Sequence, residues 1–167
     1  DMPFMKRYSK SYLSKNPYKK SIDLKATKNA CKKFKNIPTS VVNFVEGTRF
    51  NVNKQLEFGS PYKHLMMPKT GGLALTLSSM GELFDNIIDV TIIYPNGPPS
   101  FWNMLSGNFN HVIVDIRVLP VESWLYEGDY QQDNHFRERI SNWLSSIWLI
   151  KDERINFILR DIKEDNA

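Results

Sequence analysis

Apolar residues recur along the chain with two periods, and each period predicts a different kind of element. Short runs at Val41–Val45, Asp89–Tyr94 and His111–Leu119 are typical of buried strands. Every second residue of the last run lies on one face of the predicted strand, namely Val112, Val114, Ile116 and Val118. The stretch Pro95-Asn96-Gly97-Pro98-Pro99 ends the second strand, because such residues form turns.

Helical spacing predicts helices between and after these strands. They run from Asp23 to about Asn36, from Leu73 to Leu83, from Asn134 to about Ile150, and over a final segment with Ile155, Ile158, Leu159 and Ile162. Residues 8–22 are predicted to form a short helix and loop, and residues 50–63 a polar loop. Because strands and helices alternate, we expect an α/β fold with a mostly parallel central sheet flanked by helices.

The composition excludes several classes of protein. A chain of 167 residues, 41% of them hydrophobic, is large enough for one domain with a buried core and is not a disordered tail. Its single cysteine, Cys31, excludes an internal disulfide and fits a reducing compartment. No apolar run approaches the roughly 20 residues of a membrane-spanning helix. No metal-ligand spacing and no nucleotide-binding glycine motif occurs, so we expect neither a metal nor a cofactor.

The charge is unevenly distributed along the chain. Residues 1–70 carry 15 Lys and Arg against 4 Asp and Glu, a net charge of +11, and residues 71–167 carry 7 against 14, a net charge of −7. The basic part could face anionic lipid headgroups, a phosphorylated substrate or nucleic acid. Residues 6–35 are rich in lysine and tyrosine, which suits contact with an anionic membrane surface.

Glu46-Gly47-Thr48-Arg49 is the segment with the clearest candidate chemistry. Glycine allows the backbone to approach an anion, threonine donates a hydrogen bond, and the arginine guanidinium binds a phosphate with two parallel hydrogen bonds. This order of residues therefore suits a phosphate site. A turn at a strand end with a surface ion pair would have the same sequence.

Several blocks together resemble the glycerolipid acyltransferase family, of the lysophosphatidic acid acyltransferase type. Glu46 to Arg49 matches the third motif of the family, and Phe4-Met5-Lys6-Arg7 resembles its second. Lys69-Thr70-Gly71 resembles the stretch that follows the third motif, and Val90 to Pro95 resembles the fourth, an apolar strand closed by proline. The amino-acid sequence of Asn43–Phe50 is similar to that of a bacterial inner-membrane branch of the family, which is related to the lysocardiolipin acyltransferases.

The resemblance implies transfer of a fatty acyl group from acyl-CoA or acyl carrier protein to a hydroxyl of a lysophospholipid such as lysophosphatidic acid, in phospholipid synthesis or remodelling. It also implies a membrane-associated protein on the cytoplasmic face, and no nucleic-acid partner. The resemblance also implies roles for single residues. Arg49 and Arg7 would bind the phosphate, with Lys69 as a further contact, and Glu46 would orient Arg49 or the acceptor. Gly47 and Thr48 would shape the turn, and Pro95 would form a wall near the acyl donor.

The catalytic motif of the family, a histidine followed five residues later by an aspartate, is absent from the chain. His64, His111 and His135 are followed at that distance by Lys69, Ile116 and Ile140. We therefore expect residues 1–167 to be the C-terminal part of a single acyltransferase domain, incomplete at its N-terminus, with little acyl transfer on its own. Two alternatives remain: a non-catalytic member of the fold that binds anionic lipid, and a basic nucleic-acid-binding domain.

Overall fold

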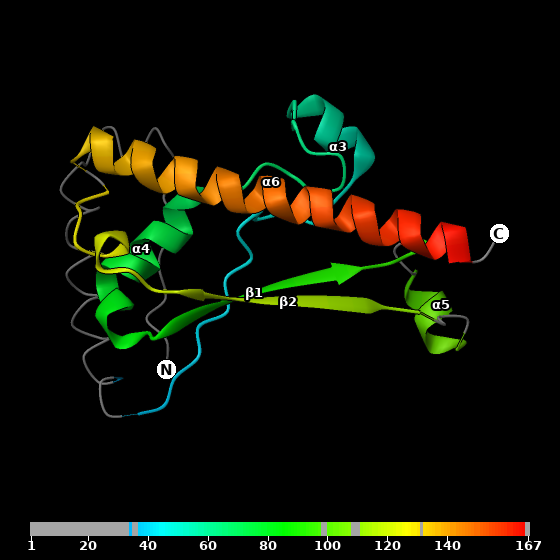
Figure 1. The fold of residues 1–167 in the computed structure, drawn as a ribbon, viewed down its shortest axis with the longest axis horizontal. Coiled ribbons are helices and arrows are strands. Elements are labelled where there is room, and N and C mark those ends of the chain that lie inside the picture. Colours follow the sequence, from blue (N-terminus) through cyan, green and yellow to red (C-terminus); the bar gives the residue numbers. More distant parts are fainter. Residues whose placement is uncertain (1–33, 35–36, 98–99, 108–110, 131, 166–167) are drawn as a thin grey trace. The chain divides into compact units, whose positions relative to one another are not determined.

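The computed structural model describes residues 34, 37–97, 100–107, 111–130 and 132–165 (Figure 1). The helix predicted from Asp23 and the segment 8–22 lie outside the described residues, apart from Phe34. The chain divides into two compact units, which are described in turn. The first comprises Asp1–Val45, Lys69–Asp85 and Val121–Ser141, and the second comprises Glu46–Pro68, Asn86–Pro120 and Asn142–Ala167.

The first unit is helical. Helix α4, Thr70–Met80, continues into the 3-10 turn η2, Gly81–Leu83, and packs with a second 3-10 turn, η3, Ser123–Leu125. Its buried side chains are Ala74, Leu77, Met80, Leu125, Phe136 and Ile140. A β-carbon added to Gly81 would lie 2.5 Å from Cβ of Tyr126, so the close packing of η2 requires glycine there. The helix predicted over Leu73–Leu83 is confirmed, but it begins earlier, at Thr70.

Helix α6, Asn134–Asp165, is continuous over 32 residues and belongs to both units. Asp133 caps its start by accepting a hydrogen bond from the Phe136 amide at 3.1 Å. The prediction of two separate helices was therefore wrong. The residues at the predicted break, Lys151 to Arg154, include no glycine or proline, and Lys151 is buried and ion-paired rather than solvated as a linker lysine would be.

The second unit contains the sheet, which has two strands. Strand β1, Asn86–Ile93, pairs with β2, Ile113–Pro120, in antiparallel register, with Asp89 opposite Arg117. The strands predicted over Asp89–Tyr94 and His111–Leu119 are thus confirmed. The prediction of a mostly parallel central sheet was wrong, because no parallel pair of strands occurs in the part of the chain that the structure describes. In its described residues, the connection between the two strands contains one helix, α5, Phe101–Leu105, which is far shorter than the crossover that joins parallel strands.

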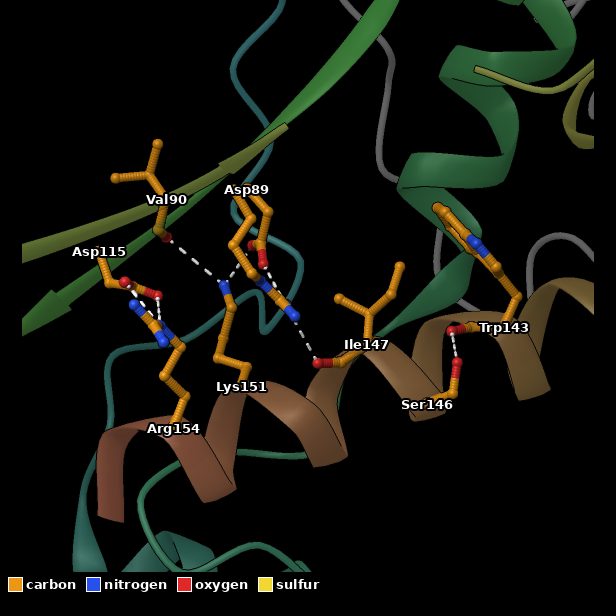
Figure 2. Close-up of polar contacts among 9 residues, drawn as sticks. Asp89, Val90, Asp115, Trp143, Ser146, Ile147, Lys151 and Arg154 are labelled. Carbon is orange, nitrogen blue, oxygen red and sulfur yellow. Dashed lines mark hydrogen bonds and ion pairs between the residues drawn. The ribbon is translucent and has the colours of Figure 1, made fainter. Parts of the chain in front are cut away.

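The two faces of the sheet have unusual polarity. The exposed face is apolar. It consists of Ile88, Val90 and Ile92 together with the four alternating residues predicted to share a face, Val112, Val114, Ile116 and Val118. The opposite face carries Asp89, Asp115 and Arg117, and α6 lies against it through ion pairs from Lys151 and Arg154 (Figure 2). Alternating exposure with one open face is typical of antiparallel sheets, which explains why the parallel arrangement was a wrong inference from these strands.

Two further segments differ from the predictions. The buried strand predicted over Val41–Val45 was wrong: residues 41–44 have no regular secondary structure, Val45 begins a turn, and Val42 and Phe44 are 78% and 84% exposed. The predicted loop 50–63 contains helix α3, Val52–Glu57. Asn51 caps this helix, with its side-chain oxygen accepting from the amides of Asn53 and Lys54 at 2.9 and 3.3 Å.

Candidate functional site

The Glu46–Arg49 segment forms a turn without regular secondary structure at the start of the second unit. Gly47 adopts a φ of +66°, in the left-handed region that other residues rarely enter. The glycine of the motif is therefore needed for the backbone path, as the sequence suggested. The turn places an anchored carboxylate on one side of Gly47 and an exposed guanidinium on the other.

Glu46 is directed into the unit. Its Oε1 accepts a hydrogen bond from the Met66 amide at 3.1 Å, and the side chain is half-buried. Burial raises the pKa of the Glu46 carboxyl above its ordinary value of 4.5, while the Met66 amide, the charge of Lys151 and a hydrogen bond from Trp148 act to lower that pKa. The carboxylate is therefore held in place by the Met66 amide, which belongs to another segment of the chain.

The residue that holds Glu46 belongs to a loop, residues 60–68, that is itself fixed by α6. The Trp148 indole donates to the Met66 carbonyl at 3.1 Å, and the Asp152 carboxylate accepts from the amides of Lys63 and His64 at 2.8 and 2.7 Å. From helix α3, the Gln55 side-chain amide donates to three backbone carbonyls of the loop, those of Tyr62, Lys63 and Leu65. These contacts remove most of the freedom that a loop of this length would otherwise have.

Behind the loop, charged side chains connect α6 to the inner face of the sheet. Lys151, only 7% exposed, forms an ion pair with Asp89, and Arg117 Nη2 pairs with the other oxygen of Asp89 at 2.6 Å (Figure 2). Arg117 also donates to the Ile147 carbonyl at 3.3 Å. Further along α6, Arg154 pairs with Asp115 at 2.7 Å, and this arginine is 52% exposed.

The cationic side of the turn faces outward. Arg49 is exposed, and no hydrogen bond or ion pair engages it among the residues that the structure describes. The Thr48 hydroxyl accepts a hydrogen bond from Lys54 Nζ at 3.3 Å. Lys54 was not predicted as a site residue, although the Asn51 cap that begins α3 would have placed it in the first turn of a helix next to the motif. An unengaged guanidinium with a nearby ammonium suits an anionic ligand.

The remaining predicted residues are not joined to this turn by the described contacts. Lys69 lies in the first unit, where it precedes α4 and its amide donates to the Val45 carbonyl at 2.8 Å. Pro95 follows β1 in the second unit and is half-buried, with no described hydrogen bond to the turn. Arg7 lies outside the described residues, so its predicted role as a second phosphate ligand stays a prediction.

The histidines form no catalytic pair in the described structure. Nε2 of His64 is buried and has no hydrogen-bond partner there, whereas His111 and His135 are exposed. Across the described ranges, no group of His, Cys, Asp and Glu could hold a metal ion. Nor does any helix in those ranges have the length and apolar character to cross a membrane.

Known proteins similar to this chain share one name. The sequence is 30% identical to 1-acyl-sn-glycerol-3-phosphate acyltransferase delta of Bos taurus over 58% of this chain and 30% of that protein. It is 28% identical to the Homo sapiens protein of the same name, over 64% of this chain and 28% of that protein. The chain thus spans about 30% of the length of these curated relatives. No family model and no solved structure matches it. These findings support a distant relation to lysophosphatidic acid acyltransferases.

Proposed function

We propose that the Glu46–Arg49 turn binds the phosphate of a lysophospholipid acceptor in a protein that transfers a fatty acyl group to that lipid. The observation that carries this proposal is the exposed Arg49, which no described residue engages, beside a carboxylate held from behind by Met66. The name of the relatives supports the choice of ligand, because a 1-acyl-sn-glycerol 3-phosphate has one phosphate and one free hydroxyl.

The reaction has a defined chemical balance. The acceptor hydroxyl attacks the thioester carbonyl of acyl-CoA or acyl carrier protein, a carbon–oxygen bond forms, the carbon–sulfur bond breaks, and the hydroxyl proton passes to the departing thiolate. In this proposal Arg49, with Thr48 and Lys54 beside it, binds and orients the phosphate. No histidine of the chain is followed five residues later by an aspartate, so binding is the step that we assign to these residues.

Binding of two lipids that differ only in the phosphate tests this proposal. We expect the chain to bind octanoyl lysophosphatidic acid at least tenfold more tightly than the matching monoacylglycerol, because charged hydrogen bonds to phosphate contribute about 1.5–3 kcal/mol each. Titration calorimetry below the concentration at which either lipid forms micelles measures both affinities. Equal affinities would overturn the phosphate site, and binding of both lipids only through the acyl chain would favour a general lipid-binding protein.

We also propose that α5 contacts the surface of a phospholipid membrane. Phe101, Trp102, Met104 and Leu105 are 67%, 74%, 60% and 64% exposed on this short helix. No Asp, Glu, Lys or Arg occurs between Val90 and Val114, so the segment has no charge to keep it in water. Tryptophan and phenylalanine next to apolar residues favour the membrane interface, where the rings lie at headgroup depth.

Substitution of α5 residues tests this contact. We expect the double variant Trp102→Ser, Leu105→Ser to bind vesicles of phosphatidylcholine and phosphatidylglycerol about tenfold more weakly, because burial of such side chains contributes about 1.5–3 kcal/mol each when complete. Cosedimentation with vesicles measures the affinity. Phe157→Ser, which removes a 53% exposed aromatic from α6, is the matched control and should leave binding unchanged. Equal losses in both variants would contradict a specific role for α5.

A further inference from the structure

Glu46 and the buried lysine of α6 belong to one connected set of contacts. Met66 is at its centre, because its amide donates to Glu46 while its carbonyl accepts from the Trp148 indole. Met66 and Trp148 are 2% and 7% exposed, so water does not compete effectively for these bonds. The ammonium of Lys151 lies over the Trp148 ring, 4.8 Å from its centre. The set thus leads from the phosphate turn to the middle of α6.

Lys151 has a fixed position within this set. Besides its ion pair with Asp89, its Nζ lies 3.5 Å from the Val90 carbonyl, and its side chain is almost entirely buried. The positive charge of Lys151 acts to lower the pKa of the Glu46 carboxyl, whereas burial raises that pKa by a larger amount. An ionised Glu46 is the stronger acceptor for the Met66 amide. The charge of Lys151 therefore strengthens the one described hydrogen bond that ties the turn to the loop.

We propose that Trp148 and Lys151 are positioning residues for the phosphate-binding turn, which hold Met66 against Glu46 so that Arg49 is presented in one geometry. This inference rests on the proposed function. A binding group that is already ordered loses less conformational freedom when the ligand arrives, so the affinity is higher. Neither residue needs to contact the ligand for this effect.

Arg154 offers a matched control on the same helix. Like Lys151, it pairs with an aspartate of the inner face of the sheet, here Asp115, but no described contact connects it to Glu46 or Met66. If α6 mattered only for the stability of the unit, loss of either ion pair would affect ligand binding through stability alone. If the inference is correct, only the change at Lys151 acts on the turn.

A double-mutant cycle separates these cases. We expect Lys151→Met and Trp148→Phe each to weaken binding of glycerol 3-phosphate by about three- to tenfold, which corresponds to coupling energies typical of residues in one network. In a Glu46→Gln background, where no carboxylate remains to be held ionised, each change should weaken binding less than about twofold. Arg154→Met should leave the affinity unchanged. Calorimetric titration measures affinity, and thermal unfolding identifies variants that have lost the fold.

A spectroscopic signature gives a readout that a purely structural role would not move. We expect the carbon-13 resonance of the Glu46 carboxyl to titrate at a higher pH in Lys151→Met than in the wild type, and at the wild-type pH in Arg154→Met. An unchanged titration in Lys151→Met, or equal effects of Lys151→Met with and without Glu46→Gln, would overturn the inference. If the wild type does not bind glycerol 3-phosphate, the proposed function fails instead; if it binds and Lys151→Met binds equally well, only the inference fails.

Discussion

Replacement of Arg49 by alanine is expected to weaken binding of glycerol 3-phosphate by about 100-fold. Two charged hydrogen bonds of a guanidinium to phosphate, at about 1.5–3 kcal/mol each, account for a loss of this size. Because Arg49 is exposed and unengaged in the described structure, its loss should change the free energy of unfolding by less than about 0.5 kcal/mol. This variant should therefore lose affinity for glycerol 3-phosphate while it keeps the stability of the wild type.

Two comparison variants sharpen this prediction. Arg49→Lys should bind with intermediate affinity, because lysine keeps the charge but loses the planar fork that matches phosphate. Arg160→Ala removes an exposed arginine from α6 and should bind like the wild type. Calorimetric titration at one fixed salt concentration measures all three affinities, since surface electrostatics depend on ionic strength. An Arg49→Ala variant that binds as tightly as Arg160→Ala would show that the phosphate is bound elsewhere.

Replacement of Asp89 by alanine is expected to lower the free energy of unfolding by about 3–5 kcal/mol, the range for breaking a buried ion pair from one side. Asp89 serves two cations at once, and its loss leaves Lys151, 7% exposed, without a carboxylate partner among the described residues. Asp115→Ala is the matched control on the neighbouring strand. Its partner Arg154 is 52% exposed and can be hydrated, so the expected loss is below about 1 kcal/mol.

Urea unfolding of both variants measures this difference, with Asp89→Asn as an intermediate that keeps the size and one acceptor oxygen. Equal losses at the two positions would mean that the buried pairs contribute no more than the exposed one. That result would also remove the physical basis for a fixed Lys151 beneath the phosphate turn, because the ion pair with Asp89 holds the lysine in place.

The elements whose pattern is local could be predicted from the sequence. Strand β2 was recognised from the alternation of Val112 to Val118, and these residues do share a face. That the face is exposed, and that the charged face lies against α6, depends on Asp89, Arg117 and Lys151 coming together from three segments. Alternation alone reports that one face differs from the other. It does not report which face is covered. Alternation of apolar and polar residues along a strand is typical of antiparallel sheets, so this pattern should have weighed against the parallel sheet that we predicted.

Short helices were missed because length is the main signal of a helix in a sequence. α3 and α5 have six and five residues, too few for an apolar period to appear. Their capping residues, Asn51 and Ser100, were the available signals. The opposite error was made in α6, where two separate helices were predicted in place of one. Lys151 is instead a buried member of one long helix.

At the candidate site, the motif itself was visible in the sequence and its support was not. Gly47 adopts the conformation that makes glycine necessary, and Arg49 is exposed. The groups that hold Glu46, from Met66 and Trp148, lie in separate segments, and no spacing rule connects residues that meet only through the fold. The sequence could therefore predict a candidate phosphate site, but not the contacts from α6 to the loop that holds Glu46.

The most direct test of the central claim observes Arg49 itself. Nitrogen-15 and proton resonances of its guanidinium, assigned by their loss in Arg49→Lys, can be followed while glycerol 3-phosphate or glycerol is added. If the turn binds phosphate, the Arg49 resonance should shift in a saturable manner with glycerol 3-phosphate, move downfield as its N–H groups donate to the anion, and remain unchanged with glycerol. An Arg49 resonance that does not respond to glycerol 3-phosphate, at concentrations where the ligand binds the chain, would contradict the account.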